Sequence, residues 1–559
     1  MSHWHSARTV AALLGLVLIG TGMLGFVGAS PARAAGTVHA PIVGSGSTWS
    51  ANALQQWIRN VWSNYQWKIT YSESGSTQGR NDFANGTSDF GVSEIPYGIA
   101  NSNEGDTPPN RGFAYMPIVA GGTAFMYNLE IGGKRVTNLR LSGDTIAKIF
   151  TGVITRWDDA QVKVDNPALA LPSIPIVPVV RSDGSGATAQ TSIWLRQEHA
   201  AVWDAYCPKV GREMVNGHCG VTSNFPVIPG TGFVARSGSN GVAGYVAQPH
   251  AVGAITFVEY SYALNSGFPV AKVLNSAGYY SEPTAQNVAV ALLSAHINED
   301  TTSPNYLTQD LSDVYTSGDP RTYPLSSYSY SILPTDMSAG FTENKGLTLA
   351  DFGAYFLCEG QNQAETLGYS PLPINLVTAG QKQIQKVPGG DPVIKGISDC
   401  NNPTFSPDGS NKVANEAPLP PDCDKQGATQ CGTGTGGAKD TPTGPAVGGA
   451  AGGSAGGSTG TDTGGASGAG SDGGTESGGS SGGGGNSSVV DADAAPVIIA
   501  ATPQSIPAPD VGALPSIAML GAGTGLLAFS ALPPLLGKRS RKSLLPDPAR
   551  GSPTRTSKD

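Results

Sequence analysis

The sequence predicts an α/β body large enough for two lobes, followed by a long non-globular C-terminal region. One strand–loop–helix pattern occurs three times between residues 41 and 195. The chain of 559 residues contains 76 Gly, and the excess gathers in residues 432–488, where too few side chains are apolar to form a core. Removing this stretch and both ends leaves residues 36–400, which is enough for a two-lobed body.

The first strand–loop–helix unit lies near the start of the body. Residues 41–43 form a short apolar strand, and residues 44–48 form a loop that reads Gly-Ser-Gly-Ser-Thr. Residues 49–65 carry apolar side chains at helical spacing and predict a helix.

The second and third units repeat this order. The second has an alternating strand at 67–71, the turn 74–77, which reads Ser-Gly-Ser-Thr, and a short helix that ends at Ala84. The third has an apolar strand at 174–180, the loop 181–187 and a helix that runs through Trp-Leu.

All three loops end in Ser or Thr beside Gly, directly before a helix. Ser and Thr are good helix N-caps, so three ordinary caps remain an alternative interpretation. Gly also lets a ligand approach the backbone, and the unpaired N–H groups and the dipole of a helix N-terminus attract anions. Arg181 adds a planar guanidinium that matches the geometry of an oxyanion. The three loops therefore predict a site for a tetrahedral oxyanion.

The strand-like segment 88–94 adds carboxylates to this picture. A carboxylate repels a fully ionised anion but accepts a hydrogen bond from an anion that still carries a proton. Phosphate carries such a proton near pH 7 and sulfate does not, so Asp89 or Glu94 in the site would favour phosphate. For either residue alone, a solvated surface charge remains the alternative.

Four motifs resemble those of the high-affinity phosphate-binding proteins of bacterial phosphate ABC importers, which are solute-binding proteins of the periplasmic type. These motifs are Gly44–Trp49, Ser74–Thr77, Asp89–Glu94 and Arg181–Gly186. The resemblance continues in residues 149–158 and 254–262 and covers about residues 38–390 in the order of the family.

The resemblance implies a bilobed solute-binding protein fold, with two mixed α/β lobes, a ligand cleft between them and a chain that crosses between the lobes more than once. It also implies eight phosphate-binding residues, which are Thr48, Trp49, Ser76, Glu94, Arg181, Ser185, Gly186 and Ala187. Asp183 is expected to orient Arg181 and offset its charge, and Glu94 stands where the family has an Asp that accepts the phosphate proton.

Three positions depart from the family pattern. Trp49 stands where Phe is usual, but only its backbone is needed. Ala187 replaces a Thr and removes one hydroxyl, for which Thr188 could partly substitute. Glu94 keeps the charge of the family's Asp but adds a methylene, which shifts the acceptor by about 1.5 Å. The last two changes bear on affinity and selectivity.

The function that the resemblance implies is an extracytoplasmic receptor that binds inorganic phosphate and delivers it to the transmembrane subunits of an ABC permease. No cofactor, metal site or enzymatic activity is expected, because no HExxH or P-loop motif is present and the one GxSxG match, at 452–456, lies in the Gly-rich stretch. The net charge of −9 argues against nucleic acid as a partner. The alternatives are a binder of another oxyanion or small solute, and a membrane-anchored surface or adhesion protein that kept the fold without transport.

Both ends of the chain indicate export and anchoring. Arg8, the apolar run 10–27 and the Ala-rich residues 32–35 are typical of a signal peptide, with a retained membrane anchor as the alternative. Residues 513–537 carry no charge and precede a basic cluster, which predicts a membrane anchor with its tail in the cytoplasm. The full order is signal peptide 1–35, bilobed phosphate-binding domain 36–400, Cys-containing extension 401–431, Gly/Ser-rich disordered linker 432–512, C-terminal transmembrane anchor 513–537 and basic cytoplasmic tail 538–559.

The six cysteines predict disulfides, because an exported chain matures in an oxidising compartment. Fifteen pairings are formally possible. Nearness in sequence favours Cys207 with Cys219 and Cys423 with Cys431, which leaves Cys358 for Cys400.

Overall fold

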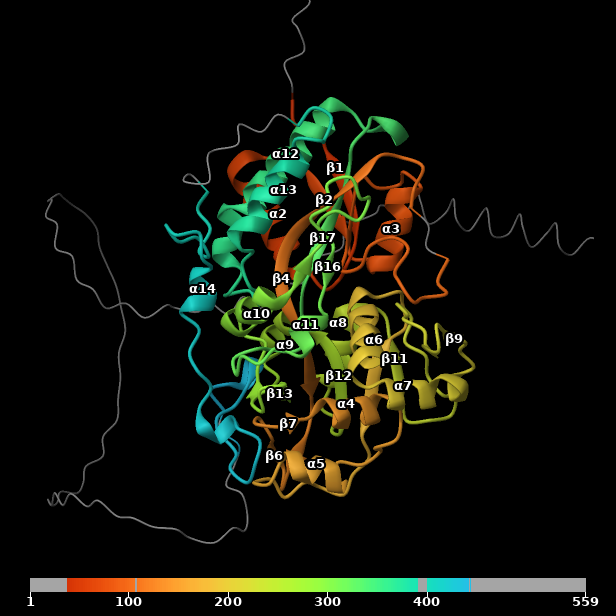
Figure 1. The fold of residues 1–559 in the computed structure, drawn as a ribbon, viewed down its shortest axis with the longest axis vertical. Coiled ribbons are helices and arrows are strands. Elements are labelled where there is room, and N and C mark those ends of the chain that lie inside the picture. Colours follow the sequence, from red (N-terminus) through yellow and green to blue (C-terminus); the bar gives the residue numbers. More distant parts are fainter. Residues whose placement is uncertain (1–37, 106–107, 391–399, 442, 444–559) are drawn as a thin grey trace, which may run out of the picture. The chain divides into compact units, whose positions relative to one another are not determined.

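The computed structural model describes residues 38–105, 108–390, 400–441 and 443. One long strand, β4 (Phe113–Tyr127), belongs to both lobes of this body (Figure 1). Residues 113–122 of β4 pair with β17 (Ser326–Pro334) in the first lobe, and residues 123–127 pair with β12 (Ala254–Glu259) in the second. The predicted bilobed α/β fold is confirmed, but the two lobes share one continuous path of strands and do not have separate sheets.

The first lobe combines the start of the chain with a later segment that returns to it. Its remaining strands are β1 (Ile42–Gly46), β2 (Ile69–Ser72) and β3 (Phe90–Ser93). Its main helices are α2 (Ala51–Tyr65), α3 (Ser76–Ala84), α12 (Glu343–Leu357) and α13 (Ile374–Ile384).

The second lobe is built mainly from the middle of the chain. Its other strands in the large sheet are β7 (Arg140–Leu141), β8 (Val177–Arg181), β11 (Val234–Arg236), β13 (Val270–Leu274) and β14 (Tyr280–Ser281). Its helices are α4 (Gly143–Phe150), α5 (Ala160–Asp165), α6 (Gly186–Glu198), α7 (Ala200–Tyr206), α8 (Gly238–Val246) and α9 (Tyr260–Ser266). Short hairpins are formed by β5 (Glu130–Ile131) with β6 (Lys134–Arg135) and by β9 (Met214–Val215) with β10 (His218–Cys219).

The return to the first lobe passes through α10 (Ala285–Ala291), β15 (His296–Ile297), β16 (Gln309–Asp310) and α11 (Ser312–Tyr315). The main path of the sheet is β11-β8-β12-β4-β17-β3-β1-β2. β1 is parallel to β2 and β3, and β8 is parallel to β11 and β12. Because parallel strands end at the same edge of a sheet, each lobe gathers several loops at one edge, which is where α/β proteins bind ligands.

The glycines of the first loop serve sheet packing. β1 extends through Gly46, so half of the expected loop 44–48 is strand. A Cβ at Gly44 would lie 2.1 Å from the ring of Phe90, and one at Gly46, where φ is 140°, would lie 2.1 Å from the carbonyl oxygen of Val92. These two glycines therefore let β3 approach β1 closely, whereas the sequence suggested that they make room for a ligand.

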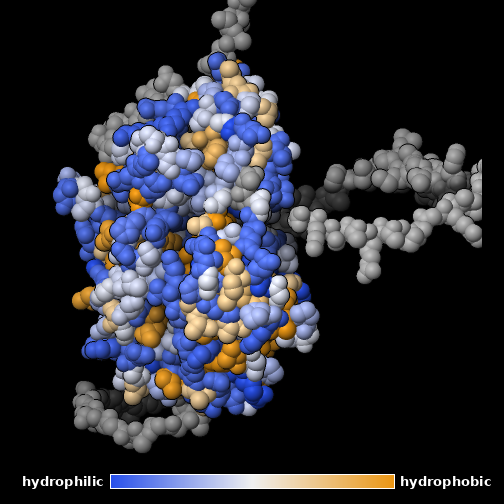
Figure 2. All heavy atoms as spheres, turned by 45° about the vertical axis from the view of Figure 1, so that its right-hand side comes forward, coloured by the Kyte–Doolittle hydropathy of each residue, from blue (hydrophilic) through white to orange (hydrophobic). Residues whose placement is uncertain are grey.

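The core lies on both faces of this curled sheet. One buried cluster fills the first lobe around Trp57, and two fill the second lobe, around Trp157 and around Val242. Figure 2 shows that hydrophilic residues prevail on one outer face, with smaller apolar spots between them. The apolar residues of the body thus gather inside the two lobes.

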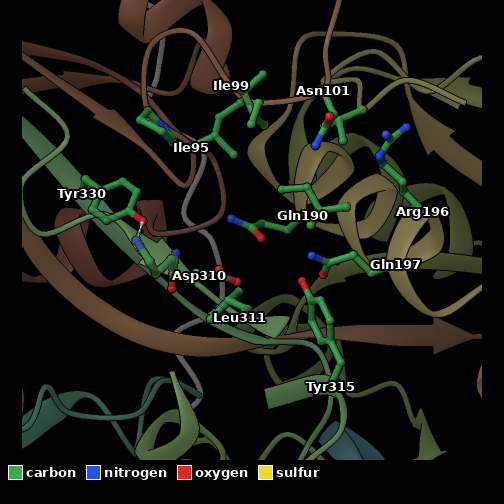
Figure 3. A pocket seen from close by; sticks show the side chains of 15 residues that line it. Ile95, Ile99, Asn101, Gln190, Arg196, Gln197, Asp310, Leu311, Tyr315 and Tyr330 are labelled. Atoms are coloured by element: carbon green, nitrogen blue, oxygen red, sulfur yellow. Dashed lines mark hydrogen bonds between the residues drawn. The ribbon is translucent and has the colours of Figure 1, made fainter. Parts of the chain in front are cut away.

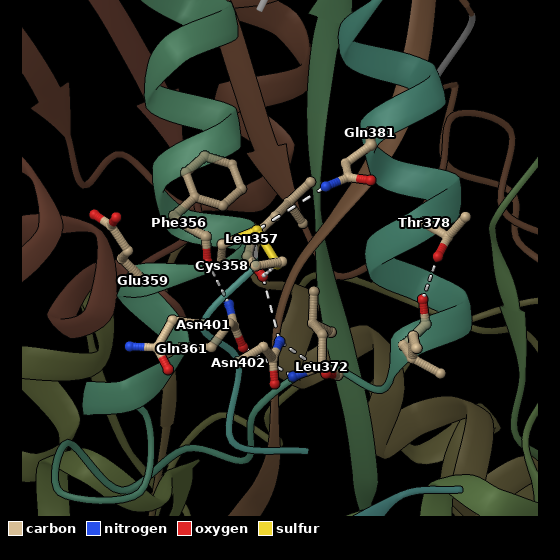
Figure 4. Close-up of a disulfide and its surroundings, with 12 residues drawn as sticks. Phe356, Leu357, Cys358, Glu359, Gln361, Leu372, Thr378, Gln381, Asn401 and Asn402 are labelled. Carbon is tan, nitrogen blue, oxygen red and sulfur yellow. Dashed lines mark hydrogen bonds between the residues drawn. A yellow bond between two sulfur atoms is a disulfide. The ribbon is translucent and has the colours of Figure 1, made fainter. Parts of the chain in front are cut away.

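All three predicted disulfides are confirmed: Cys207–Cys219, Cys358–Cys400 and Cys423–Cys431. Figure 4 shows how the second one joins the end of α12 to the start of the C-terminal extension. Beside it, the side-chain amide of Asn402 donates hydrogen bonds to the carbonyls of Leu357 and Leu372 (3.3 and 3.2 Å). The extension is therefore fixed to the first lobe where it begins.

The extension then runs along the body to the second lobe. Its short helix α14 (Lys412–Asn415) packs against α10. Farther along, Asp424 pairs with Lys272 (2.6 Å), and the guanidinium of Arg140 donates to the carbonyls of Cys423 and Thr429 (3.1 and 2.8 Å). The extension therefore contacts both lobes.

The linker that the sequence places from residue 432 starts later than expected. Thr435 is fully buried, and its hydroxyl bonds the carbonyls of Val270 and Thr137. A Cβ at Gly437 would lie 2.5 Å from the carbonyl oxygen of Ala263 in α9. Glycine here allows the backbone to pack against the second lobe, so residues 432–441 belong to the folded body and the expectation that they are unpacked is wrong.

The expected signal peptide at 1–35, transmembrane anchor at 513–537 and tail at 538–559 lie outside the described residues. Within the described ranges, none of the helices combines the length and the apolar character needed to cross a bilayer.

Candidate functional site

The predicted site residues meet between the lobes, where the strands of each lobe end. Thr48 and Trp49 precede α2, Ser76 is the first residue of α3 and Glu94 follows β3. From the second lobe, Arg181 ends β8, Ser185 caps α6, and Gly186 and Ala187 begin that helix. Their side chains are buried, and Glu94 is 1% exposed.

Glu94 is surrounded by serine hydroxyls. Ser76 Oγ donates to its Oε2 (2.6 Å) and Ser329 Oγ donates to its Oε1 (2.8 Å), which also accepts a hydrogen bond from Ser47 Oγ. These donors come from three separate segments of the first lobe. They satisfy both carboxylate oxygens and fix the carboxylate at the face of the second lobe.

A short chain of hydrogen bonds crosses between the lobes at this point. The N–H of Gly186 donates to Ser76 Oγ (3.0 Å), and this hydroxyl donates in turn to Glu94. A Cβ at residue 186 would lie 2.0 Å from Glu94 Oε2. Glycine is therefore required here, because the added methylene of Glu94 places its carboxylate against the first turn of α6.

Arg181 supplies a buried positive charge on the other side of the site. Its Nε donates to Asp183 Oδ1 (2.8 Å), and its Nη2 donates to Oδ2 of the same carboxylate. Burial alone would raise the pKa of Asp183, but the hydrogen bonds and the charge of Arg181 outweigh burial and lower it. Asp183 therefore stays ionised and orients the guanidinium, which is the role that the motif resemblance predicted for it.

Ser239 is a contact that the sequence analysis missed. The hydroxyl of Ser239, at the start of α8, lies 2.7 Å from Thr48 Oγ1 and 3.4 Å from Arg181 Nη1. Its backbone N–H also donates to Thr48 Oγ1 (3.2 Å). Residues 237–239 read Ser-Gly-Ser where the chain passes from β11 into α8. They repeat the strand–loop–helix pattern, so a search for that pattern could have found Ser239.

Three buried tyrosines fix the loop before α2, and no local sequence pattern indicated them. The hydroxyls of Tyr71, Tyr262 and Tyr369 donate to the consecutive carbonyls of residues 47, 48 and 49. Burial raises the pKa of each tyrosine well above its ordinary value, so each remains a donor at neutral pH. The loop before α2 is therefore held by Tyr71 and Tyr369 from the first lobe and by Tyr262, in α9, from the second.

Two hydroxyls at the start of α6 differ in the hydrogen bonds that they make. Ser185 Oγ accepts the N–H of Thr188 (3.3 Å) as an N-cap, although the motif resemblance made it a phosphate donor. Thr188 Oγ1 is buried and makes no hydrogen bond to any residue that the structure describes. It is thus a spare donor beside Ala187, where the family pattern has a hydroxyl.

Two other residues take structural positions. Asp89 accepts the N–H of Val43 (2.9 Å) and an ammonium hydrogen bond from Lys345 (2.8 Å), so it lies outside the site. The ring of Trp49 packs edge-on against Tyr369 (5.8 Å between centroids), which leaves its backbone as the part next to the site. No cluster of potential metal ligands occurs among the described residues.

A separate cavity of about 350 Å³ lies next to the site and is lined by both lobes. Figure 3 shows the amides of Gln190 and Gln197 and the Tyr315 hydroxyl pointing into it from the second-lobe side, with Ile95 and Ile99 on the opposite wall. Gln190 also donates to the backbone carbonyl of Glu94 (2.8 Å). The Gln190 side chain therefore separates this mainly apolar cavity from the charged site.

Known proteins resemble this chain over most of its folded body. A model of the PBP superfamily domain matches residues 29–359. The phosphate-binding protein PstS of Xylella fastidiosa (strain Temecula1) is 30% identical over 357 residues, which is 64% of this chain and 87% of that protein. Phosphate-binding protein PstS 2 of Mycobacterium tuberculosis is 29% identical over 386 residues, which is 67% of this chain and 96% of that protein.

The structure of a high-affinity periplasmic phosphate-binding protein bound with phosphate aligns with a TM-score of 0.47 at 19% identity, and the match covers 61% of this chain and 93% of that one.

Proposed function

The chain belongs to the PBP superfamily and, within it, to the family of bacterial phosphate-binding proteins, and on this premise we propose that it binds inorganic phosphate between its two lobes. The observation that carries the proposal is the meeting of the Glu94 carboxyl group, a buried Arg181 and the N-terminus of α6 at one point. Hydrogen phosphate needs all three, because it has oxygens that accept and one proton to donate.

The two lobes would recognise different features of the anion: the second lobe its charge and the first lobe its proton. Arg181 and the first N–H groups of α6 face the charge of the anion, and the guanidinium keeps its orientation because Asp183 holds it. Glu94 is the acceptor for the phosphate proton, and its serine partners hold it in place. Sulfate brings no proton at neutral pH, so Glu94 would repel it.

Binding requires that the lobes separate and close again. In the closed arrangement, Gly186 and Ser76 bond each other across the cleft. An arriving phosphate would take over these two donors, and the bonds that they now make would be exchanged for bonds to its oxygens. Closure of two lobes around a ligand is the usual motion of such proteins.

We further propose that the protein works outside the cytoplasm, delivers phosphate to an ABC permease and carries out no chemical step. Export through residues 1–35 and anchoring through residues 513–537 are part of this proposal, and both rest on the sequence. The described residues end at 443, and the Gly/Ser-rich sequence between them and the proposed anchor, about 70 residues long, would serve as a flexible tether.

Calorimetric titration of the full chain with phosphate, alone and in excess sulfate, tests the proposed function. We expect phosphate to bind at one site with an affinity that sulfate does not reduce. Tight binding of sulfate would favour a receptor for another oxyanion, and binding of neither ion would favour the surface-protein alternative.

A further inference from the structure

A segment of the first lobe reaches across to the second lobe beside the site. Residues 95–105 follow β3, and Tyr97 ties them to the first lobe because its hydroxyl donates to the carbonyl of Arg80 (2.6 Å). Farther along, Arg111 lies over the ring of Phe83 (4.2 Å to the centroid) and donates to its carbonyl (3.1 Å). Two anchors thus keep this part of the chain on the first lobe.

Between these anchors, Asn101 contacts the second lobe. Its carbonyl accepts the N–H of Val221 (2.8 Å), and its side-chain oxygen accepts from the amide of Asn216 (3.0 Å). The segment that contains Asn216 and Val221 is held by the Cys207–Cys219 disulfide and by Asp204, which accepts the N–H of Cys219 (2.7 Å). The contact is therefore made to a firmly held part of the second lobe.

Glu104 makes the strongest of these contacts. Its Oε1 accepts from Thr222 Oγ1 (2.6 Å) and from the N–H of Ser223 (2.8 Å), and its Oε2 accepts from Ser223 Oγ (2.5 Å). All three donors belong to the second lobe. Burial alone would raise the pKa of Glu104, but the hydrogen bonds from Ser223 and Thr222 outweigh burial and lower it, so the carboxylate is ionised at neutral pH.

Ser223 also contacts two of the three predicted anion loops, 74–77 and 181–187. Its carbonyl accepts the N–H of Ser185 (2.8 Å), and its hydroxyl accepts from Thr77 Oγ1 (3.0 Å), which lies next to Ser76. Ser223 therefore connects the Glu104 carboxylate directly to the loops that would hold phosphate. Because the hydrogen bonds of Glu104 join different lobes, separation of the lobes breaks them all.

We propose that Glu104 is a positioning residue that fastens the first lobe to Ser223 in the closed form and thereby sets the rate at which phosphate leaves the cleft. This inference rests on the proposed function, because the rate that it concerns is the dissociation of phosphate from the proposed site. Glu104 itself lies outside the set of groups that would contact phosphate. Its contribution is confined to the closed form, so it acts on release and leaves capture by the open form unchanged.

Stopped-flow measurement of phosphate binding to the full chain tests the inference. We expect Glu104→Gln to raise the dissociation rate constant about tenfold, in line with the loss of hydrogen bonds to a charged group, while the association rate constant changes less than about twofold. The matched control is Glu213→Gln, because Glu213 lies nearby on the other lobe and its carboxylate accepts, among the described residues, one long hydrogen bond from Asn103 (3.5 Å). This control should release phosphate at the rate of the unchanged protein.

A double-mutant cycle shows whether the partner is Ser223. Ser223→Ala should also speed release. The variant that carries both Ser223→Ala and Glu104→Gln should raise the dissociation rate constant by less than the product of the two single effects. Independent, multiplicative effects would contradict the assignment. A lower melting temperature with an unchanged release rate would reduce Glu104 to a purely structural residue.

A second readout does not depend on phosphate. All six cysteines form disulfides, so spin labels can be placed at Ser63→Cys and Val164→Cys, which are exposed positions on the first and second lobes. Without ligand, Glu104→Gln should increase the population with a long distance between the labels, and an unchanged distribution would overturn the inference. Failure of the unchanged protein to bind phosphate would instead contradict the proposed function, and the label distances would still decide the role of Glu104.

Discussion

The two lobes bring opposite chemistry to the same cleft. The first lobe presents a carboxylate, Glu94, within a ring of hydroxyls, and the second presents the guanidinium of Arg181 beside the N-terminus of α6. Arg181 and α6 belong to a strand–loop–helix unit, whereas Glu94 lies directly after β3, which is followed by another strand. The difference teaches that the end of a strand supplies a position at the edge of a sheet, and that the residue placed there decides whether the position donates or accepts.

The glycines of the two lobes also serve different purposes. Gly44 and Gly46 in the first lobe make room for the ring of Phe90 and the backbone of Val92, so they serve packing. Gly186 in the second lobe makes room for the carboxylate of Glu94 and so serves the site. A Gly-rich loop in the sequence does not by itself reveal which of these two needs it meets.

The largest expected effect comes from removing the positive side. Arg181→Ala should weaken phosphate binding at least a hundredfold, because the anion loses its only guanidinium partner among the predicted site residues and Asp183 becomes an unpaired negative charge. Sulfate should lose affinity as well. Calorimetry on the full chain measures both, with Arg156→Ala as the control, since Arg156 forms an exposed pair with Asp158. An affinity like that of the unchanged protein would remove Arg181 from the site.

A smaller effect is expected from crowding the contact between the two sides. Gly186→Ala would place a methyl group 2.0 Å from Glu94 Oε2, so the closed form must shift. We expect phosphate affinity to fall about tenfold to a hundredfold, with a slower approach to the closed form in the fluorescence of the chain's tryptophans. Gly244→Ala is the control in another helix, because a Cβ there meets nothing within 4 Å. Equal affinities in the two variants would show that α6 does not pack against Glu94.

The smallest effect concerns the residue that orients Arg181. Asp183 has a lowered pKa in the folded protein, so it contributes stability above its ordinary pKa of 3.8, and this contribution is lost as the pH falls through the lowered value. Asp183→Asn should therefore reduce stability by about 2 kcal/mol at pH 7 and by much less near pH 3. Urea unfolding at both pH values checks this, and a difference that is independent of pH would contradict the ion pair.

Much of this organisation could be predicted because it depends on local sequence. The strands at 67–71 and 174–180, the helices that follow them and the disulfides Cys207–Cys219 and Cys423–Cys431 are indicated by patterns within short stretches, and the structure confirms them. The pair Cys358–Cys400 spans 42 residues and was predicted by elimination. The predicted residues of the site also meet, since each lies at the end of a strand or the start of a helix.

The contacts that were missed depend on residues far apart in the sequence. Ser329 lies 235 residues from Glu94, and Tyr369 lies 320 residues from the Trp49 carbonyl that it bonds, so no local pattern connects them. The same holds for the folded start of the Gly-rich stretch, where Thr435 bonds Val270. Composition predicts that such a stretch lacks its own core, but it does not predict docking onto a core built elsewhere.

The central claim is that Glu94 recognises the proton of phosphate while the second lobe recognises its charge. Competition between phosphate and sulfate for Glu94→Gln, measured at pH 7 by calorimetry on the full chain, tests this claim most directly. Gln keeps the size of the side chain but presents a donor to the anion, so we predict that sulfate binds more tightly than to the unchanged protein and that the preference for phosphate falls at least tenfold. An unchanged preference would contradict the claim and assign the selectivity to the second lobe.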